Sequence, residues 1–237
     1  MRQLHRHLVR VFALLLVVSQ LEGHGSADSP SLSAASAVVR LPSHGASATV
    51  IHTEKGRTLL LGCGHAFLGP DRNKPIHMDG PNAPQGLPQI IACDHQLDLS
   101  LIEVKAGPVR HVAAVAGPGY RPGTRLVSVG YDEMKTPATQ RPATLVGSDE
   151  RLTFTRERPW HGRSGGALLD LDTGLLIGVV QGYEASPPWH GLYASHAAVL
   201  HFLRRNGWTV GEGTRQDPVP DRLLTPFLPR LPHLCPT

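Results

Sequence analysis

Short apolar runs separated by turn residues are the feature that most constrains the fold of this chain. Its 237 residues include 25 glycines and 21 prolines, and these two residue types punctuate most of the apolar stretches. Their combined share lies below the range of about 25–30% that is typical of low-complexity segments. Many short apolar runs with turns between them are typical of β-rich proteins. We therefore expect an all-β fold.

The predicted strands come in neighbouring pairs. Residues 46–62 contain two β-branched or apolar runs around the turn EKGR and predict a hairpin. Residues 167–180 contain two apolar runs around an Asp-Thr-Gly turn and predict another. Only residues 194–206 have apolar residues at helical spacing, and Gly207 follows as a helix terminator. Further strands are expected at residues 89–93, 97–104, 125–131, 143–147 and 151–156.

The first 27 residues have the features of a secretory signal peptide. Arg2, Arg6 and Arg10 are followed by the apolar run VFALLLVVS and then by small residues at Gly25 and Ala27. The run is shorter than the ~20 residues needed to cross a bilayer, and no later segment approaches that length. We expect a secreted or periplasmic mature protein with no stable membrane span. The alternatives are an uncleaved anchor or a buried strand.

The segments that flank the predicted domain differ from it in composition. Residues 28–36 are rich in small residues and predict a linker, and residues 208–237 are rich in proline and predict a disordered tail. Between them, residues 37–207 form one domain. The sequence contains no internal repeat.

Charge and cysteine usage exclude several classes of function. The formal charge of +4 comes mostly from arginines that are scattered along the chain, so nucleic acid is not an expected partner. The 14 histidines form no H-E-x-x-H motif and no paired Cys/His spacing, so neither a metal site nor a cofactor is expected. Cys63, Cys93 and Cys235 allow at most one internal disulfide. Whether Cys63 and Cys93 are bridged stays open.

Ser164 lies in the sequence Gly-Arg-Ser-Gly-Gly, which has two interpretations besides an ordinary turn. The pattern G-x-S-x-G matches the nucleophile elbow of α/β-hydrolases, but that motif requires a helix directly after the serine. A predicted hairpin follows instead, so the elbow is rejected. The other interpretation requires a histidine and then an aspartate upstream of the serine. His65, after the run TLLLGCG, and Asp98, before an apolar strand, meet that order.

Other residues compete for these positions. His95 and His161 lie near Asp98 and Ser164 in the sequence, but neither follows the first predicted hairpin as the histidine of GCGHAF does. Asp94 competes with Asp98, and the apolar strand that begins after Asp98 favours the latter.

These blocks together resemble the chymotrypsin-fold (trypsin-like) serine peptidases, nearest to the bacterial HtrA/Deg-type proteases. ASATVIHTEKGRTLLLGCGHAF is similar to their histidine block, QLDLSLIEV to their aspartate block, and WHGRSGGALLDLDTGLLIGVV to their serine block. The resemblance implies two six-stranded antiparallel β-barrels, at about 37–112 and 118–193, and a C-terminal helix at about 194–206. Trypsin itself has an aspartate before the serine that pairs with an activated N-terminus. Arg163 stands at that position here, so this switch should be absent. No PDZ-like module follows Gly207 in this sequence.

The resemblance also implies roles for individual residues. His65, Asp98 and Ser164 would form the catalytic triad, and the backbone N–H groups of Gly162 and Ser164 would form the oxyanion hole. The implied function is a secreted serine endopeptidase that forms an acyl-enzyme on a polypeptide substrate. The alternative is a binding module that has the peptidase fold but no activity. The oligomeric state stays open.

A cleavage preference follows from the expected substrate site. The resemblance places the substrate-binding wall at Val180, Gln181, Gly182 and Tyr183. No carboxylate lies in this wall to pair a basic side chain, an unpaired cation in an apolar pocket is costly, and Arg158 is expected at the base of the pocket. We therefore expect small or medium apolar residues before the scissile bond. Glu184 is the acid that one side-chain rotation would bring into the pocket.

Overall fold

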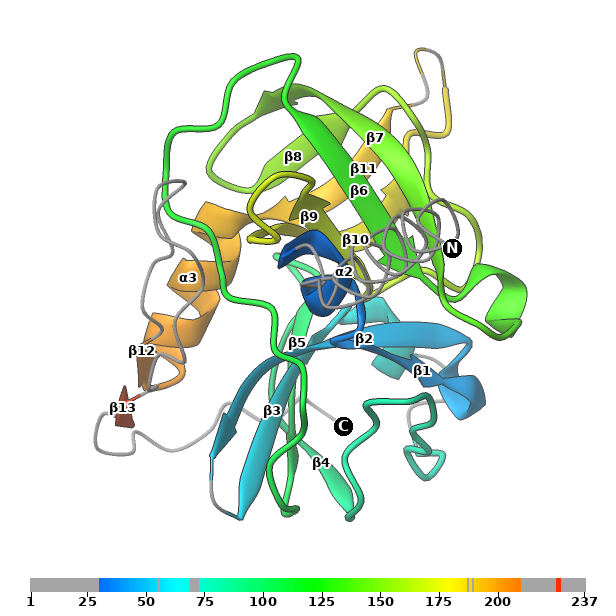
Figure 1. Cartoon of the computed structure of the whole chain (residues 1–237), viewed down its shortest axis with the longest axis vertical. Helices are drawn as coiled ribbons and strands as arrows, with labels where there is room; N and C mark the ends of the chain where they lie inside the picture. The colour runs from blue at the N-terminus through cyan, green and yellow to red at the C-terminus, as the bar shows by residue number, and fades with distance from the viewer. Residues whose placement is uncertain are drawn as a thin grey trace, which may run out of the picture.

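The computed structural model describes residues 30–54, 56–68, 73–186, 188, 190–209 and 225–226. The predicted signal peptide and most of the predicted tail lie outside these residues. The chain forms two β units, with the N-terminal sheet below and the C-terminal barrel above in the view of Figure 1.

The first unit is one antiparallel sheet with the strand order β1-β2-β3-β5-β4. This sheet is not closed, so it differs from the six-stranded barrel expected for residues 37–112. The segment between β3 and β4 is a poor source of a closing strand, because its repeated prolines remove backbone donors. Where the structure describes this segment, it pairs with β1 at the single bridge between Arg40 and Asp79. The strands are β1 (Val38–Leu41), β2 (Ala46–Glu54), β3 (Arg57–Gly62), β4 (Pro88–Asp94) and β5 (Leu99–Val104).

The second unit is a closed six-stranded barrel with the order β10-β11-β8-β7-β6-β9, as expected. The two strands that follow Ser164 read as unbroken apolar runs because both of their faces are buried. Leu168 and Ile177 belong to the core of this barrel, whereas Leu169 and Leu176 belong to the core shared with the first unit. The strands are β6 (Arg125–Gly130), β7 (Thr139–Ser148), β8 (Leu152–Thr155), β9 (Ala167–Asp170), β10 (Leu176–Tyr183) and β11 (Gly191–Ser195).

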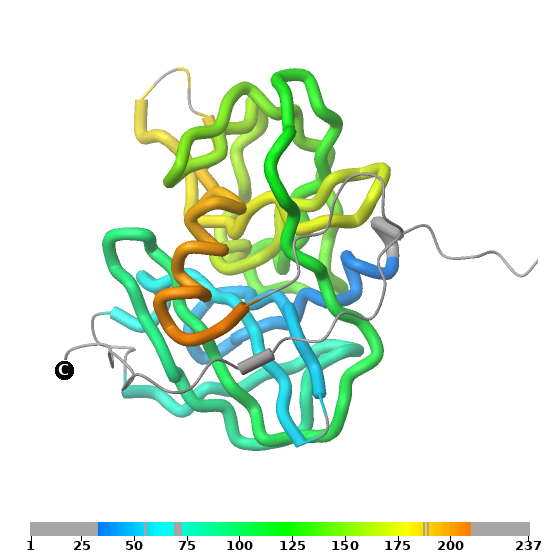
Figure 2. Tube along the Cα trace, turned by 90° about the vertical axis from the view of Figure 1, so that its left-hand side faces the viewer, coloured from blue at the N-terminus to red at the C-terminus, as the bar shows by residue number. Residues whose placement is uncertain are grey.

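The C-terminal helix α3 (His196–Arg205) begins two residues later than expected. Ala194 pairs with Leu152 as part of β11, and Ser195 caps the helix by accepting a hydrogen bond from the Ala198 N–H. The helix packs against β10, β11 and β12 (Trp208–Thr209), and lies beside both units in Figure 2.

Two flanking segments contain more structure than expected. The expected linker includes the short helix α2 (Pro30–Ala35), whose Ala34 and Ala35 are buried. In the expected tail, β12 pairs with β13 (Thr225–Pro226). No helix of the described residues has both the length and the hydropathy needed to cross a membrane.

Candidate active site

The three predicted catalytic residues come from three chain segments at the junction between the units. His65 begins the 3-10 helix η2 (His65–Phe67) after β3, and Asp98 ends the turn before β5. Ser164 comes from the second unit, shortly before β9. Backbone pairing joins the units here, because the Ser47 N–H on β2 donates to the Ser164 carbonyl at 2.8 Å.

Asp98 binds His65 through both carboxylate oxygens. One oxygen accepts a hydrogen bond from the His65 backbone N–H at 2.7 Å, and the other lies 2.8 Å from Nδ1 of the ring. A Cβ on Gly64 would lie 3.2 Å from the Asp94 carbonyl oxygen and 3.3 Å from the Asp98 carboxylate, so the lack of a side chain there eases the approach. Two contacts to one carboxylate fix both the position and the orientation of the imidazole, and they leave Nε2 for another group.

These contacts raise the proton affinity of His65. The hydrogen bond to Asp98, followed by the interaction with the Cys63 side chain, raises the pKa of His65 from 6.5 to about 10, although partial burial opposes the shift. Asp98 therefore stabilises the protonated form of the ring.

Ser164 is half-buried, and its hydroxyl donates a long hydrogen bond of 3.5 Å to the Gln181 carbonyl. Within the described part of the chain, no hydrogen bond joins this hydroxyl to His65. Catalytic hydrogen bonds are often long or poorly aligned before a substrate binds. The geometry of Ser164 is therefore compatible with a nucleophile.

The glycines around Ser164 are needed for close packing. Gly162 and Gly165 have φ values of 90° and 85°, which favour glycine. A Cβ on Gly162 would lie 2.4 Å from the Tyr131 carbonyl oxygen, and one on Gly165 would lie 2.1 Å from that of Ser47. The two glycines are therefore required because the backbone around Ser164 packs closely against two separate segments, at Tyr131 and at Ser47.

The backbone amides predicted to form the oxyanion hole are available as donors. Among the described residues, the N–H groups of Gly162 and Ser164 have no protein acceptor. The His161 carbonyl accepts a hydrogen bond of 2.7 Å from the Glu133 N–H. A trans peptide holds its C=O and N–H on opposite sides, so the Gly162 N–H points away from Glu133.

Ser47 is a site residue that the sequence did not reveal. Besides its backbone bond to Ser164, its buried hydroxyl donates to the Gly162 carbonyl at 2.9 Å and accepts from the Tyr131 N–H at 3.2 Å. One side chain of the first unit thereby holds two segments of the second. Its only sequence signal is its position at the start of the first predicted hairpin, which is too weak to single it out.

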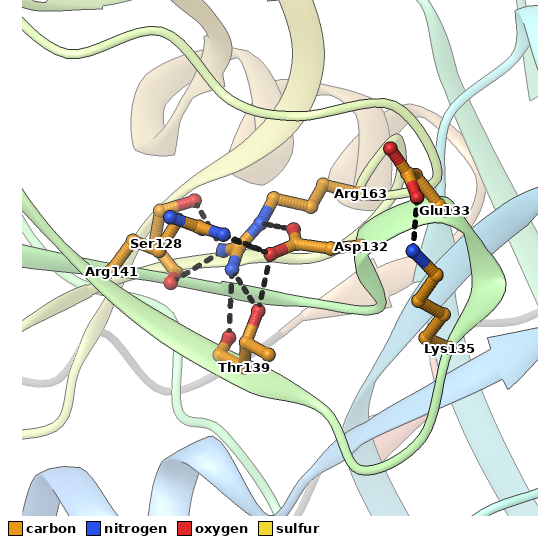
Figure 3. A network of polar contacts seen from close by, with 7 residues as sticks. All are labelled: Ser128, Asp132, Glu133, Lys135, Thr139, Arg141 and Arg163. Atoms are coloured by element: carbon orange, nitrogen blue, oxygen red, sulfur yellow. Dashed lines mark hydrogen bonds and ion pairs between the residues drawn. The ribbon is translucent and has the colours of Figure 1, made fainter.

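Arg163, next to the predicted nucleophile, points away from the site and is fully buried. It forms an ion pair with Asp132, as Figure 3 shows. Asp132 was not predicted either, because it lies far from Arg163 in the sequence. The signal that would find it is indirect, since a buried arginine requires a buried acceptor.

The four predicted wall residues of the substrate site have different surroundings. Val180 is buried in the core of the barrel, and the Gln181 side chain donates to the Leu97 carbonyl at 2.7 Å. Gly182 and Tyr183 are half-buried, and a Cβ on Gly182 would meet nothing within 4 Å. Gln181 is half-buried too, so Val180 is the wall residue with no surface left for a ligand.

A cation lies over the end of this wall. The Arg158 guanidinium stacks 4.5 Å from the centre of the Tyr183 ring, and the His161 ring meets the same tyrosine edge-on at 6.4 Å. Glu184 is bound to His190, whose Nδ1 lies 3.2 Å from the carboxylate. A cavity of about 230 Å³ is lined by Ser128, Arg141, Pro142, Ala143, Glu157, Arg158, Pro159, Trp160, Arg163 and Tyr193.

The residues that competed for the triad are engaged elsewhere. Asp94 accepts hydrogen bonds from two backbone N–H groups of its own turn and pairs with Arg205. His95 lies beside the Cys93 sulfur, at 3.8 Å. The contact to the His65 ring therefore falls on Asp98.

The structure leaves Cys63 and Cys93 unbridged to each other. Cys63 is a buried free thiol, whereas Cys93 is disulfide-bonded, so the partner of Cys93 lies outside the described residues. Across those residues, no three histidine, cysteine or acidic side chains are grouped closely enough to hold a metal ion.

The comparison with known families decides the assignment of this fold. A model of the trypsin-like peptidase domain matches residues 46–179. The chain belongs to the trypsin-like peptidase family. The resemblance seen in the three sequence blocks is thus confirmed. Among curated proteins, none matches the sequence.

Solved structures of proteases share the fold. The active form of the Rv3671c protease from M. tuberculosis is 20% identical with a TM-score of 0.59, over 76% of this chain and 85% of that one. The serine endoprotease from Yersinia pestis is 18% identical with a TM-score of 0.62, over 74% and 64%. The HtrA-type protease AlgW with a tripeptide is 19% identical with a TM-score of 0.60, over 75% and 62%. The chain thus spans less than two thirds of the last two proteins.

Proposed function

We propose that this trypsin-like peptidase is a serine endopeptidase that uses Ser164 as nucleophile, His65 as general base and Asp98 as the residue that orients the base. The observation that carries the proposal is the doubly bonded pair of His65 and Asp98, together with a serine motif whose Gly162 and Ser164 amides have no protein acceptor in the described chain. A histidine held in this way can activate a hydroxyl that is otherwise a weak nucleophile.

The proposed reaction has two halves. In the first, Ser164 Oγ attacks the scissile carbonyl carbon while Nε2 of His65 takes the hydroxyl proton. The N–H groups of Gly162 and Ser164 stabilise the oxyanion, and each such donor lowers the barrier by roughly 3–4 kcal/mol in comparable sites. His65 then protonates the leaving amine, and an acyl-enzyme remains. In the second half, water loses a proton to His65 and attacks the ester carbonyl, and His65 returns that proton to Ser164 Oγ as the acid is released.

A fluorophosphonate probe tests the proposal. The full chain should be labelled at Ser164 and should hydrolyse an unfolded polypeptide, whereas Ser164→Ala should do neither while keeping its melting temperature. Absence of both labelling and hydrolysis in the wild type would refute the proposal. It would favour the alternative, a binding module, which draws on the contact of the Ser164 hydroxyl with Gln181 rather than with His65.

We also propose export of the chain to a secreted or periplasmic location. The support is the arginine-flanked apolar segment at the N-terminus and the disulfide at Cys93, since disulfides persist in oxidising compartments. Mass spectrometry of the mature protein should find an N-terminus after about residue 27. An intact Met1 on exported protein would contradict cleavage.

A further inference from the structure

The residue that precedes the proposed nucleophile is a buried cation with every nitrogen bonded. Arg163 is 0% exposed. Its Nε donates to Asp132, one terminal nitrogen donates to the Ser128 carbonyl at 2.7 Å, and the other donates to the Thr139 carbonyl at 3.0 Å. Burying a charge in this way costs free energy unless its partners are well placed. The fold thus holds this side chain in one position.

Asp132 is the centre of the network in Figure 3. Its carboxylate pairs with Arg163 and with Arg141, and it accepts a hydrogen bond of 2.8 Å from the Thr139 hydroxyl. Burial alone would raise the pKa of Asp132, but the hydrogen bonds from Arg163, Arg141 and Thr139 lower it. The carboxylate therefore stays charged and paired at neutral pH.

The neighbouring residue holds the other side of Gly162. Residues 131–135, which we name the clamp loop, contain the 3-10 helix η4 (Asp132–Met134). The Glu133 N–H binds the His161 carbonyl at 2.7 Å, while Asp132 binds the Arg163 side chain. Two consecutive residues of the clamp loop therefore hold the two residues that flank Gly162.

The clamp loop itself is strained and anchored. Glu133 and Met134 have φ values of 48° and 60°, a conformation that costs roughly 1–2 kcal/mol per residue for an L-amino acid. Such strain persists only where surrounding contacts maintain it. The Met134 carbonyl accepts a hydrogen bond from Arg40 on β1, so the first unit also holds the loop.

We propose that Asp132 and Arg163 are positioning residues that set the Gly162 peptide with its N–H in the oxyanion hole. This inference rests on the proposed function. The pair is formed within the folded chain and requires no free chain terminus, so the hole is assembled without a cleavage step. The residue before the nucleophile, Arg163, carries a positive charge, and Asp132 of the clamp loop is its partner.

Substitution of each partner tests the positioning role. Asp132→Asn and Arg163→Met should each lower kcat by about 100-fold, the effect of losing one oxyanion donor, with KM changed less than about threefold. The double variant should lose little more than either single one, because the two residues act as a unit. Arg141→Met is the matched control, since Arg141 binds the same carboxylate from an exposed position. A kcat for Asp132→Asn equal to that of Arg141→Met would overturn the proposal.

Hydrogen exchange gives a readout that does not depend on activity. The Glu133 N–H should lose protection in Asp132→Asn and keep it in Arg141→Met, at a temperature where both variants remain folded. Unchanged protection in Asp132→Asn would overturn the positioning role even if the wild type proved inactive. Failure of the proposed function would instead show as absent labelling of Ser164 in the wild type, with the exchange difference intact.

Discussion

Replacing Asp98 by asparagine should lower the pKa of His65. Asp98 has a φ of 49°, a left-handed conformation that asparagine adopts more readily than most residues, so Asp98→Asn should keep the backbone. The amide has one acceptor oxygen and cannot accept both hydrogen bonds, of 2.7 Å and 2.8 Å, from the His65 backbone and ring. The negative charge beside the ring is also lost.

The size of the shift follows from these contacts. A hydrogen bond to a charged group contributes roughly 1.5–3 kcal/mol, and one pKa unit corresponds to about 1.4 kcal/mol, so the expected fall is about 1–2 units. The smaller value is favoured, because 45% of the His65 side chain is exposed and water screens the pair. A fall of this size from about 10 leaves the pKa above the ordinary 6.5.

Two measurements follow this ionisation: the pH dependence of kcat/KM and an NMR titration of the His65 ring in Ser164→Ala protein. Activity of the wild type should rise with pH toward about 10, where His65 becomes neutral. Asp94→Asn is the matched control, because Asp94 lies in the same turn but pairs with Arg205. An unchanged His65 pKa in Asp98→Asn, or an equal fall in the control, would refute the reasoning.

The same pair links stability to pH. Because folding raises the pKa of His65 from 6.5 to about 10, its stabilising contribution is fully present below pH 6.5 and is lost as the pH rises through 10. Urea unfolding across this window should show a smaller pH dependence in Asp98→Asn than in the wild type.

Three further substitutions test other parts of the structure. Asp94→Ala should lower the free energy of unfolding by about 1–3 kcal/mol. Because folding lowers the pKa of Asp94 below its ordinary value of 3.8, thermal melts should show this difference above pH 3.8 and lose it as the pH falls further. Gly165→Ala should cost about 3 kcal/mol or more and abolish Ser164 labelling, whereas Gly147→Ala, with no atom within 4 Å of its Cβ, should change the urea midpoint little. In a peptide library the wild type should cut after apolar residues and avoid basic ones, and Arg158→Asp should gain cleavage after basic residues; dominant cleavage after arginine or lysine by the wild type would contradict the apolar preference.

Local patterns in the sequence predicted the hairpins well. Residues 46–62 and 167–180 form hairpins with turns at the expected places, because β-branched runs and turn residues act within a few positions of each other. The closure of the first sheet could not be predicted in this way. It depends on whether the segment around Asp79, which lies 39 residues from Arg40 of β1, pairs at one position or at several.

The site was predictable to the extent that its residues have a distinctive sequence context. The pairing of His65 with Asp98 agrees with the order of the two blocks in the chain. Ser47 and Asp132 have no such context, because their contacts to residues 162–165 span the junction or the barrel. The start of α3 was placed too early for a related reason, since pairing of β11 with β8 outweighs helix propensity at Ala194.

The glycines and the arginine around Ser164 have one physical origin. Each of Gly162 and Gly165 faces a backbone carbonyl oxygen too close for a Cβ, so the segment lies against both units at once. The Arg163 side chain between them extends into the interior of the second unit, where Asp132 compensates its charge. The residue before the serine is therefore constrained by the interior of the barrel and not by the substrate. A charge at that position implies an opposite charge in a segment that packs against it, here the clamp loop, and the sequences of other chains of this family allow this pairing to be tested.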